Sequence, residues 1–148
     1  MHVVNSRGEI DQIINKTTLR PYRQIDKDIN DAFLADDLEF LAFYDYRKVY
    51  LYQNQGTELS EIFFRDGERC ALNSDQQYFL FYDYWEDELL IYTIPSMLEL
   101  TQQLETSQSV SDITISQNNQ WVAIDNEIYQ FDGGTLIFFQ DFDVYCVV

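Results

Sequence analysis

The sequence is poor in several residue types on which common classes of protein depend. Only five glycines, two prolines, two cysteines and one histidine occur among its 148 residues. The histidine, His2, lies at a terminus, which is a poor place for the base of a Ser-His-Asp or Cys-His nucleophile. No glycine-rich phosphate loop and no His-Glu-x-x-His motif is present. We therefore expect no enzyme activity, no cofactor and no metal site.

Long apolar runs are missing as well. No stretch reaches the 18 residues of a membrane span, and residues 1–20 contain no continuous apolar run long enough for a signal peptide. Cys70 and Cys146 form no C-x-x-C pair and no zinc-ligand spacing, so we interpret both as small buried residues in a reducing compartment. A disulfide between them is open but not required. These features predict a cytoplasmic protein.

Basic residues are absent from the second half of the chain. Residues 1–69 hold nine Lys and Arg against thirteen acids, a net charge of -4, while residues 70–148 hold thirteen acids and no base, a net charge of -13. The total of -17 argues against nucleic acid or an anionic membrane as partner, because such binding needs clustered cations. The same charge attracts basic proteins. The alternative explanation is that the uneven charge distribution arose by neutral drift in an ordinary acidic protein.

What the sequence does contain is enough apolar material for one folded domain. Apolar residues make up 46% of the chain and aromatic residues 16%. At this length a domain buries about two-thirds of its unfolded surface, which forms a core without cross-links. We predict a single domain over residues 1–148.

Three short helices are predicted by local patterns. Ser6 and Glu9 have the form of a capping box before Ile10, Ile13 and Ile14, which predicts a helix near residues 7–16. A weaker pattern predicts a second helix over residues 28–38. Pro95 followed by spaced Met and Leu residues predicts a third helix that ends near Glu105.

Strands are predicted from Glu39 onward by aromatic and β-branched runs that turn residues interrupt. Residues 40–46 and 49–53 form one expected hairpin, and residues 77–85 and 89–93 form another. Asp66-Gly67 predicts a third hairpin, between residues 59–65 and 68–72. Further strands are expected at 113–116, 121–124, 127–131 and 135–148. The predicted class is α+β, a mainly antiparallel meander of hairpins with two or three short helices.

One tetrapeptide occurs twice in this region. Phe43-Tyr44-Asp45-Tyr46 recurs as Phe81-Tyr82-Asp83-Tyr84, each time inside a predicted hairpin. The match could indicate a duplicated strand unit. In a chain this rich in Phe, Tyr and Asp it also arises by chance, and two copies are too few to define a repeat architecture.

Tyrosines beside acids supply the candidate binding residues. Tyr and Trp dominate interface hot spots, and surrounding carboxylates steer the partner, although single strand tyrosines more often pack within a sheet. On the last predicted strand, alternation places two carboxylates and a tyrosine on one face. The candidates for partner contact, in order, are Asp83, Tyr84, Trp85, Glu86, Asp87 and Glu88, then Asp141, Asp143 and Tyr145, then Asp45 and Tyr46.

In size, charge and Tyr-Asp-rich strands, the chain resembles the small acidic immunity proteins that bacteria make beside polymorphic or contact-dependent growth-inhibition toxins. The resemblance covers the whole chain in character and rests on no motif. It implies an inhibitor that docks an acidic, aromatic-rich surface on a cognate basic toxin such as a nuclease.

Three other functions fit the composition. One is a nucleic-acid mimic that blocks several DNA- or RNA-binding proteins. Another is a carboxylate-dependent hydrolase, which would show a bound divalent metal or a carboxyl group with a strongly raised pKa in a cleft. The last is an assembly subunit that associates with itself through an apolar patch.

Overall fold

The computed structural model describes residues 2–15, 18–34, 39–56, 58–100, 104–105 and 110–141. These residues form fifteen strands in four antiparallel sheets, and no helix occurs among them. The α+β prediction is therefore wrong in class, whereas the antiparallel meander that it contained is present. None of the described residues belongs to a helix that could cross a membrane.

Each sheet is a meander of consecutive strands. Sheet A contains β1 (His2–Val4), β2 (Glu9–Asn15) and β3 (Thr18–Gln24). Sheet B contains β4 (Asp31–Leu34), β5 (Phe40–Asp45), β6 (Lys48–Asn54) and β7 (Leu59–Asp66). Sheet C contains β8 (Arg69–Leu72), β9 (Tyr78–Asp83), β10 (Glu88–Thr93) and β11 (Leu104–Glu105). Sheet D contains β12 (Ile113–Ile115), β13 (Trp121–Ile124), β14 (Glu127–Asp132) and β15 (Thr135–Asp141).

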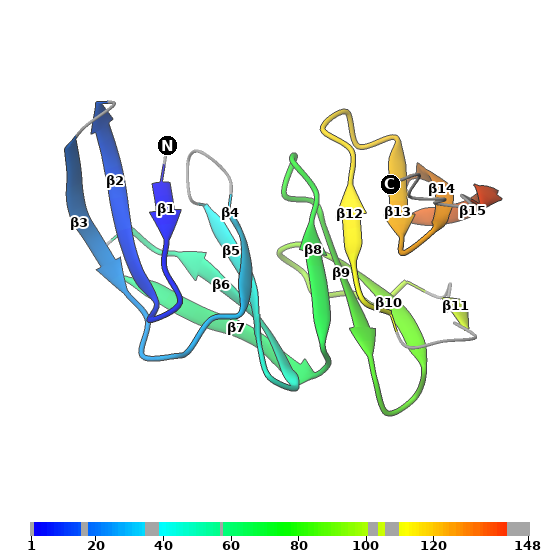
Figure 1. The fold of residues 1–148 in the computed structure, drawn as a ribbon, viewed down its shortest axis with the longest axis horizontal. Coiled ribbons are helices and arrows are strands. Elements are labelled where there is room, and N and C mark those ends of the chain that lie inside the picture. Colours follow the sequence, from blue (N-terminus) through cyan, green and yellow to red (C-terminus); the bar gives the residue numbers. More distant parts are fainter. Residues whose placement is uncertain are drawn as a thin grey trace, which may run out of the picture.

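The four sheets follow one another like the ribs of a fan (Figure 1). The first strands of sheets B, C and D form its inner edge, because β8 contacts both β4 and β12. The last strand of one sheet leads into the first strand of the next, as β7 leads into β8. By the same rule β3 is a fourth strand, since it leads into β4. In the described part of the chain, sheet A therefore has the second, third and fourth strands of such a unit.

Neighbouring sheets pack face to face, and each of the three interfaces has its own hydrophobic cluster. Sheets A and B enclose Ile10, Leu41 and Phe43, and sheets B and C enclose Ala42, Phe79 and Phe81. Sheets C and D enclose the third cluster, which contains Leu80, Tyr82, Leu89, Ile91, Val122, Ile124 and Phe131. Aromatic pairs such as Phe63 and Phe79, with ring centroids 5.7 Å apart, fill the middle interface.

Burial on both faces explains the continuous apolar runs in the sequence. Strand β9 belongs to sheet C, which lies between sheets B and D. Its Phe79 and Phe81 point to sheet B and its Leu80 and Tyr82 point to sheet D, and all four side chains are fully buried. Side chains alternate between the two faces of a strand, so a sheet between two others must be apolar at every position. The runs of sheets B and C meet this requirement.

The first predicted helix is replaced by a hairpin between β1 and β2. The Asn5 side chain accepts hydrogen bonds from the backbone N–H of Arg7 and of Glu9, and the latter is the donor that Ser6 would have bonded in the predicted capping box. Gly8 has a φ of +75°, and a Cβ there would lie 2.2 Å from the backbone oxygen of Ile25. This turn favours strand pairing, and Ile10 reaches the core from β2.

The other two helix predictions also give way to strand pairing. In the second region β4 pairs with β5 over Asp31–Leu34, and residues 35–38 lie outside the described part. In the third region Glu99 forms a β-bridge with Tyr92, and the N–H of Leu100 donates to Ile91. Spaced apolar residues there contact a sheet edge rather than one face of a helix.

The two long hairpin predictions are confirmed, but the one at Asp66-Gly67 is wrong. Strand β5 pairs with β6 and β9 pairs with β10. The Asp66-Gly67 segment connects two different sheets, because β7 pairs with β6 and β8 pairs with β9. Gly67 is needed there for close approach, since a Cβ would lie 2.8 Å from the oxygen of Tyr82.

The repeated tetrapeptide marks equivalent positions in successive sheets. Phe43 and Phe81 each lie two residues before the end of the second strand of their sheet, and each points to the preceding sheet. The two copies of the tetrapeptide therefore occupy equivalent positions in sheets B and C. The predicted strands at 113–116, 121–124 and 127–131 are present, and β15 covers the described part of the last one.

Candidate interaction surface

The turns between the second and third strands of the four sheets lie at the same end of the molecule. They follow β1, β5, β9 and β13 and point to the lower side of the view in Figure 1. We call this end the turn face and define it by residues 5–8, 45–48, 83–88 and 125–127. Most of the candidate residues from the sequence lie on it.

Asp83 holds the longest of these turns in place. Its side chain is buried, with 4% of the residue exposed, and one carboxylate oxygen accepts the backbone N–H of Trp85 at 3.0 Å and of Glu86 at 3.4 Å. The other oxygen lies 3.4 Å from a guanidinium nitrogen of Arg65. Asp83 thus organises the turn from below and is not itself presented to a partner.

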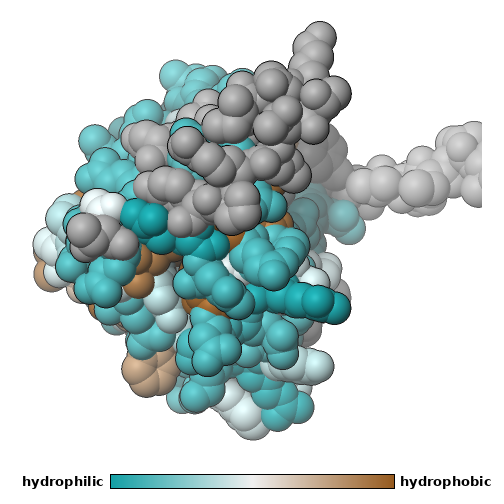
Figure 2. Space-filling view, turned by 90° about the vertical axis from the view of Figure 1, so that its left-hand side faces the viewer, coloured by the Kyte–Doolittle hydropathy of each residue, from teal (hydrophilic) through white to brown (hydrophobic). Residues whose placement is uncertain are grey.

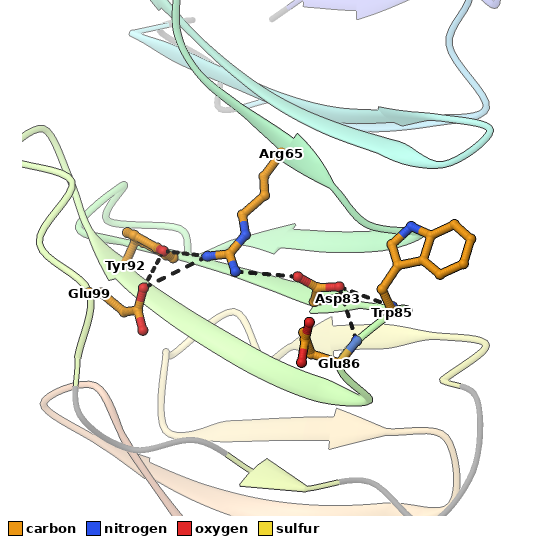
Figure 3. A network of polar contacts seen from close by, with 6 residues as sticks. All are labelled: Arg65, Asp83, Trp85, Glu86, Tyr92 and Glu99. Carbon is orange, nitrogen blue, oxygen red and sulfur yellow. Dashed lines mark hydrogen bonds and ion pairs between the residues drawn. The ribbon is translucent and has the colours of Figure 1, made fainter.

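Arg65 joins sheets B and C beneath the turn (Figure 3). From β7 it donates a hydrogen bond of 3.1 Å to the hydroxyl of Tyr92 and lies 3.9 Å from the carboxylate of Glu99. Tyr92 in turn donates to Glu99. Burial, followed by the hydrogen bond to Glu99, raises the pKa of Tyr92. The network fixes β7 against β9 and β10.

Exposed aromatic rings stand above this network. Trp85 is 62% exposed and Tyr84 is 42% exposed, and their rings meet edge to face with centroids 5.6 Å apart. Figure 3 shows the indole of Trp85 pointing away from the buried polar groups. The guanidinium of Arg47, from the adjacent turn of sheet B, lies 5.8 Å from the centre of the indole. The ring therefore already accepts a cation within the chain.

The remaining acids of this turn have different surroundings. Glu86 is exposed, and Asp87, with a φ of +55°, accepts a hydrogen bond of 2.5 Å from the hydroxyl of Tyr82. Glu88 is half-buried at the start of β10, opposite Asp83 in the strand pair. The turn thus offers the carboxylates of Glu86 and Asp87 beside Trp85.

The neighbouring turn of sheet B contributes Asp45 and Tyr46. Tyr46 is 77% exposed and has a φ of +45°, a conformation that costs energy for a bulky residue. Asp45 is half-buried, and one of its carboxylate oxygens has no hydrogen-bond partner. These two residues lie next to Arg47, so the first-ranked and third-ranked candidates from the sequence belong to one surface.

The second-ranked candidates lie elsewhere. Asp141 is exposed at the end of β15, where it pairs with Glu127 across the strands of sheet D. Asp143 and Tyr145 lie outside the described residues. Cys70 is a free, buried cysteine, and Cys146 lies beyond the described part.

Sequence reasoning missed the basic residues of this end. Arg47 and Arg65 were not candidates, because the argument from net charge drew attention only to acids. A further group of charged residues lies near Tyr44, at the inner edge of the fan. Burial raises the pKa of Tyr44, the charge of Arg69 lowers it, and the charges of Asp31 and Asp112 raise it, so that the net change is upward. Arg69 lies 5.0 Å from the Tyr44 ring and donates to the backbone oxygen of Ser111 at 2.7 Å.

Metal chemistry has no obvious place on this surface. Among the residues that the structure describes, no three His, Cys, Asp or Glu side chains converge in a way that could hold a metal ion. The exposed groups of the turn face are rings, carboxylates and guanidinium groups, which suit recognition of another molecule through stacking and charge.

No protein-family model matches the chain, and no curated protein matches it in sequence. Solved structures do match. A functionally unknown protein from Desulfotomaculum acetoxidans is 17% identical, with a TM-score of 0.66, over 95% of this chain and 50% of that one. The β-propeller domain of Cps50 (Swd1) from Myceliophteria thermophila is 12% identical, with a TM-score of 0.59, over 93% and 48%. The periplasmic gluconolactonase of Pseudomonas aeruginosa is 11% identical, with a TM-score of 0.61, over 89% and 47%.

These similarities identify the fold. The sheets of this chain correspond to blades of a β-propeller, and the chain spans about half the length of the structures that it matches. The interpretation as a toxin-immunity protein is corrected by this result, because the neighbours are propellers and lactonase-like proteins and the resemblance rested on size and charge alone. At such low sequence identity the similarity indicates the fold and does not indicate an activity.

Proposed function

We propose that this chain is a protein-interaction module of the β-propeller type, whose turn face binds a basic segment of a partner protein. The observation that carries the proposal is the group of Tyr46, Tyr84 and Trp85, which stand exposed on two adjacent turns beside carboxylates. Exposed aromatic residues on rigid turns are the usual hot spots of binding surfaces.

The position of Arg47 indicates what such a partner would present. Its guanidinium lies 5.8 Å from the centre of the indole, within the distance of a cation–π contact, so the ring suits a cation. Glu86 and Asp87 lie in the same turn, and the chain carries a net charge of -17. Arg or Lys side chains of a partner would therefore stack on the aromatic rings and pair with these acids.

The rigidity of the surface supports the same reading. The carboxylate of Asp83 accepts two backbone N–H groups of the turn, and Arg65 ties that carboxylate to the neighbouring sheet. A turn that is already ordered loses little conformational entropy when a partner binds.

A direct test uses a fluorescent oligo-arginine peptide as the probe and fluorescence anisotropy as the readout. Trp85→Ala leaves the net charge unchanged, so any loss of affinity reports on the site and not on the overall field. We expect the dissociation constant to rise at least about tenfold, the range of a cation–π hot spot. Phe138→Ala, at a ring that is 53% exposed on β15 and outside the turn face, is the matched control. Equal affinities for both variants would contradict the proposal.

The contribution of the Glu86 and Asp87 carboxylates to peptide binding can be tested with substitutions that change charge but hardly change shape. Glu86→Gln with Asp87→Asn should weaken peptide binding more than Glu58→Gln with Asp132→Asn, which removes the same charge from exposed positions elsewhere. Equal weakening by the two pairs would mean that the peptide senses only the total charge.

Hydrolysis of a sugar lactone is a second candidate. One of the similar structures is a gluconolactonase, and the charges of Asp31, Arg69 and Asp112 gather around Tyr44 near the inner edge of the blades. A carboxylate there could activate water as a general base. The test is hydrolysis of gluconolactone above the spontaneous rate, measured by acid release, with Asp31→Asn and Asp112→Asn as variants. Rates equal to the uncatalysed reaction would eliminate this candidate.

A further inference from the structure

Arg47 lies at the tip of the tight turn between β5 and β6, where it has no residue opposite it in a strand pair. The residue is exposed, and its guanidinium lies 5.8 Å from the centre of the Trp85 indole. This guanidinium forms no hydrogen bond and no ion pair with any residue that the structure describes. Within that part of the chain, its N–H donors are therefore available to a group from another molecule.

The other basic side chains near this turn already face carboxylates. Arg65 lies within ion-pair distance of two of them, one on sheet C and one just after it. Lys48 lies between Asp45 and Asp66 in the strand pairs of sheet B. Opposite charges at directly opposed positions of neighbouring strands balance each other. Arg47 is thus the cation of these two turns that a partner can reach and pair with.

The position of Arg47 has a consequence for any partner whose basic side chain approaches Trp85. A segment that carries only basic residues would bring a second cation to the ring that Arg47 already contacts. Like charges at this distance repel each other, so Arg47 would have to leave the indole. A segment that also carries a carboxylate would avoid this repulsion, because the carboxylate can pair with Arg47 where it lies.

The surroundings of these turns make charge the main basis of selection. Figure 2 looks onto the sheet A side, and its lower end, where the turn face lies, is largely hydrophilic. Glu86 and Asp87 provide carboxylates on one turn, and Arg47 provides a guanidinium on the adjacent turn. A surface with acids on one side of a ring and a cation on the other discriminates between partners by the order of their charges.

We propose that the partner segment has mixed charge, with an acidic residue next to the basic side chain that docks at Trp85. This inference rests on the proposed function, because it concerns the same turn face. The basic side chain meets Trp85 and the carboxylates of Glu86 and Asp87. The acidic side chain pairs with Arg47, whose planar guanidinium can donate two parallel hydrogen bonds to one carboxylate.

Two fluorescent peptides with the same number of arginines test the proposal by fluorescence anisotropy at low salt. One is an oligo-arginine peptide, and in the other a glutamate follows each arginine. Arg47→Gln should lower the dissociation constant of the oligo-arginine peptide about threefold and raise that of the mixed peptide about threefold, the range of an exposed ion pair. The opposite signs are the signature of the proposal, since a change in total charge alone cannot produce them.

Arg7→Gln is the matched control, because it removes the same charge from an exposed position in the sheet A turn. It should change both dissociation constants by less than about twofold. Circular dichroism spectra should show that both variants are folded. An effect of Arg47→Gln that has the same sign for both peptides, or that does not exceed the effect of Arg7→Gln, would overturn the mixed-charge inference.

The Trp85→Ala variant separates this outcome from a failure of the proposed function. If oligo-arginine binding depends on Trp85 but the two peptides respond alike to Arg47→Gln, the turn face binds basic segments without selecting mixed charge. If oligo-arginine binding does not depend on Trp85, the proposed function is wrong and the inference about its partner is overturned with it.

Discussion

Sheets B and C differ from sheet D in how their two faces are used. Every residue from Phe40 to Phe43 is buried, and so is every residue from Phe79 to Asp83, because these strands lie between two other sheets. In sheet D one face is buried while Ile137 and Phe139 on the other face are half exposed. The comparison shows that a strand is buried at every position only where a sheet packs on each of its faces.

The largest expected effect comes from comparing a phenylalanine of an inner interface with one of the bare face. Phe81 is fully buried between sheets B and C, so Phe81→Ala should lower the free energy of unfolding by about 4 kcal/mol. Phe139→Ala, at a ring that is 57% exposed, should cost under about 1 kcal/mol. Urea titrations measure both. Similar losses would mean that the two faces are packed alike.

Two glycines in the left-handed region near sheet A give the next comparison. Gly8 and Gly56 both have positive φ, so alanine costs each about 1 kcal/mol in backbone strain. At Gly8 the new Cβ also meets the oxygen of Ile25 at 2.2 Å, whereas nothing lies within 4 Å of a Cβ at Gly56. We expect Gly8→Ala to cost about 3 kcal/mol in total, again by urea titration. Equal costs for the two variants would argue against this packing of sheet A.

The ion pair that the buried Asp83 forms with Arg65 can be compared with an exposed acid of sheet D. Asp83→Ala removes the partner of Arg65 and two acceptors of the turn, and should cost about 2 kcal/mol. Asp132→Ala, at an exposed position, should change stability by less than about 0.5 kcal/mol. Thermal unfolding at neutral pH measures both, and a neutral Asp83→Ala would remove the role assigned to this carboxylate.

The smallest expected effect is a pH dependence at the interface of sheets A and B. Burial, with the nearby carboxylate of Glu61, raises the pKa of Tyr52 to about 12. Because the folded state keeps this proton longer than the unfolded chain, the stabilisation is complete below pH about 10 and declines as pH rises through 12. The difference between wild type and Tyr52→Phe in absorbance at alkaline pH should show this late ionisation. An ionisation near 10 would contradict the packing of Tyr52.

The positions of the strands could be predicted from the sequence better than the way in which the strands are arranged. The hairpins around Asp45 and Asp83 were predictable, because apolar runs end there at turn residues. The three helices were predicted wrongly because spacing such as Ile10, Ile13 and Ile14 fits a helix when the pairing partner is unknown. Asp66-Gly67 has the form of a hairpin turn but connects two blades, and only the position of Tyr82 shows why.

The candidate surface was predictable in part for similar reasons. Tyr84, Trp85 and Glu86 follow one another in the chain, so their common turn could be recognised from the sequence. Arg47 and Arg65 approach that turn from sheet B, across a distance in sequence that no local pattern spans. The match between the two copies of the tetrapeptide was the one signal of a repeat, and it was too short to be decisive by itself.

The central claim, that sheets B and C are covered on both faces and sheet D on one, can be measured directly by hydroxyl-radical footprinting. Phe64 and Phe139 are each 57% exposed, whereas Phe79 and Phe81 are fully buried between sheets B and C. We predict that Phe139 is oxidised about as readily as Phe64, and that Phe79 and Phe81 are protected. Oxidation of Phe81 at the rate of Phe139 would contradict the claim.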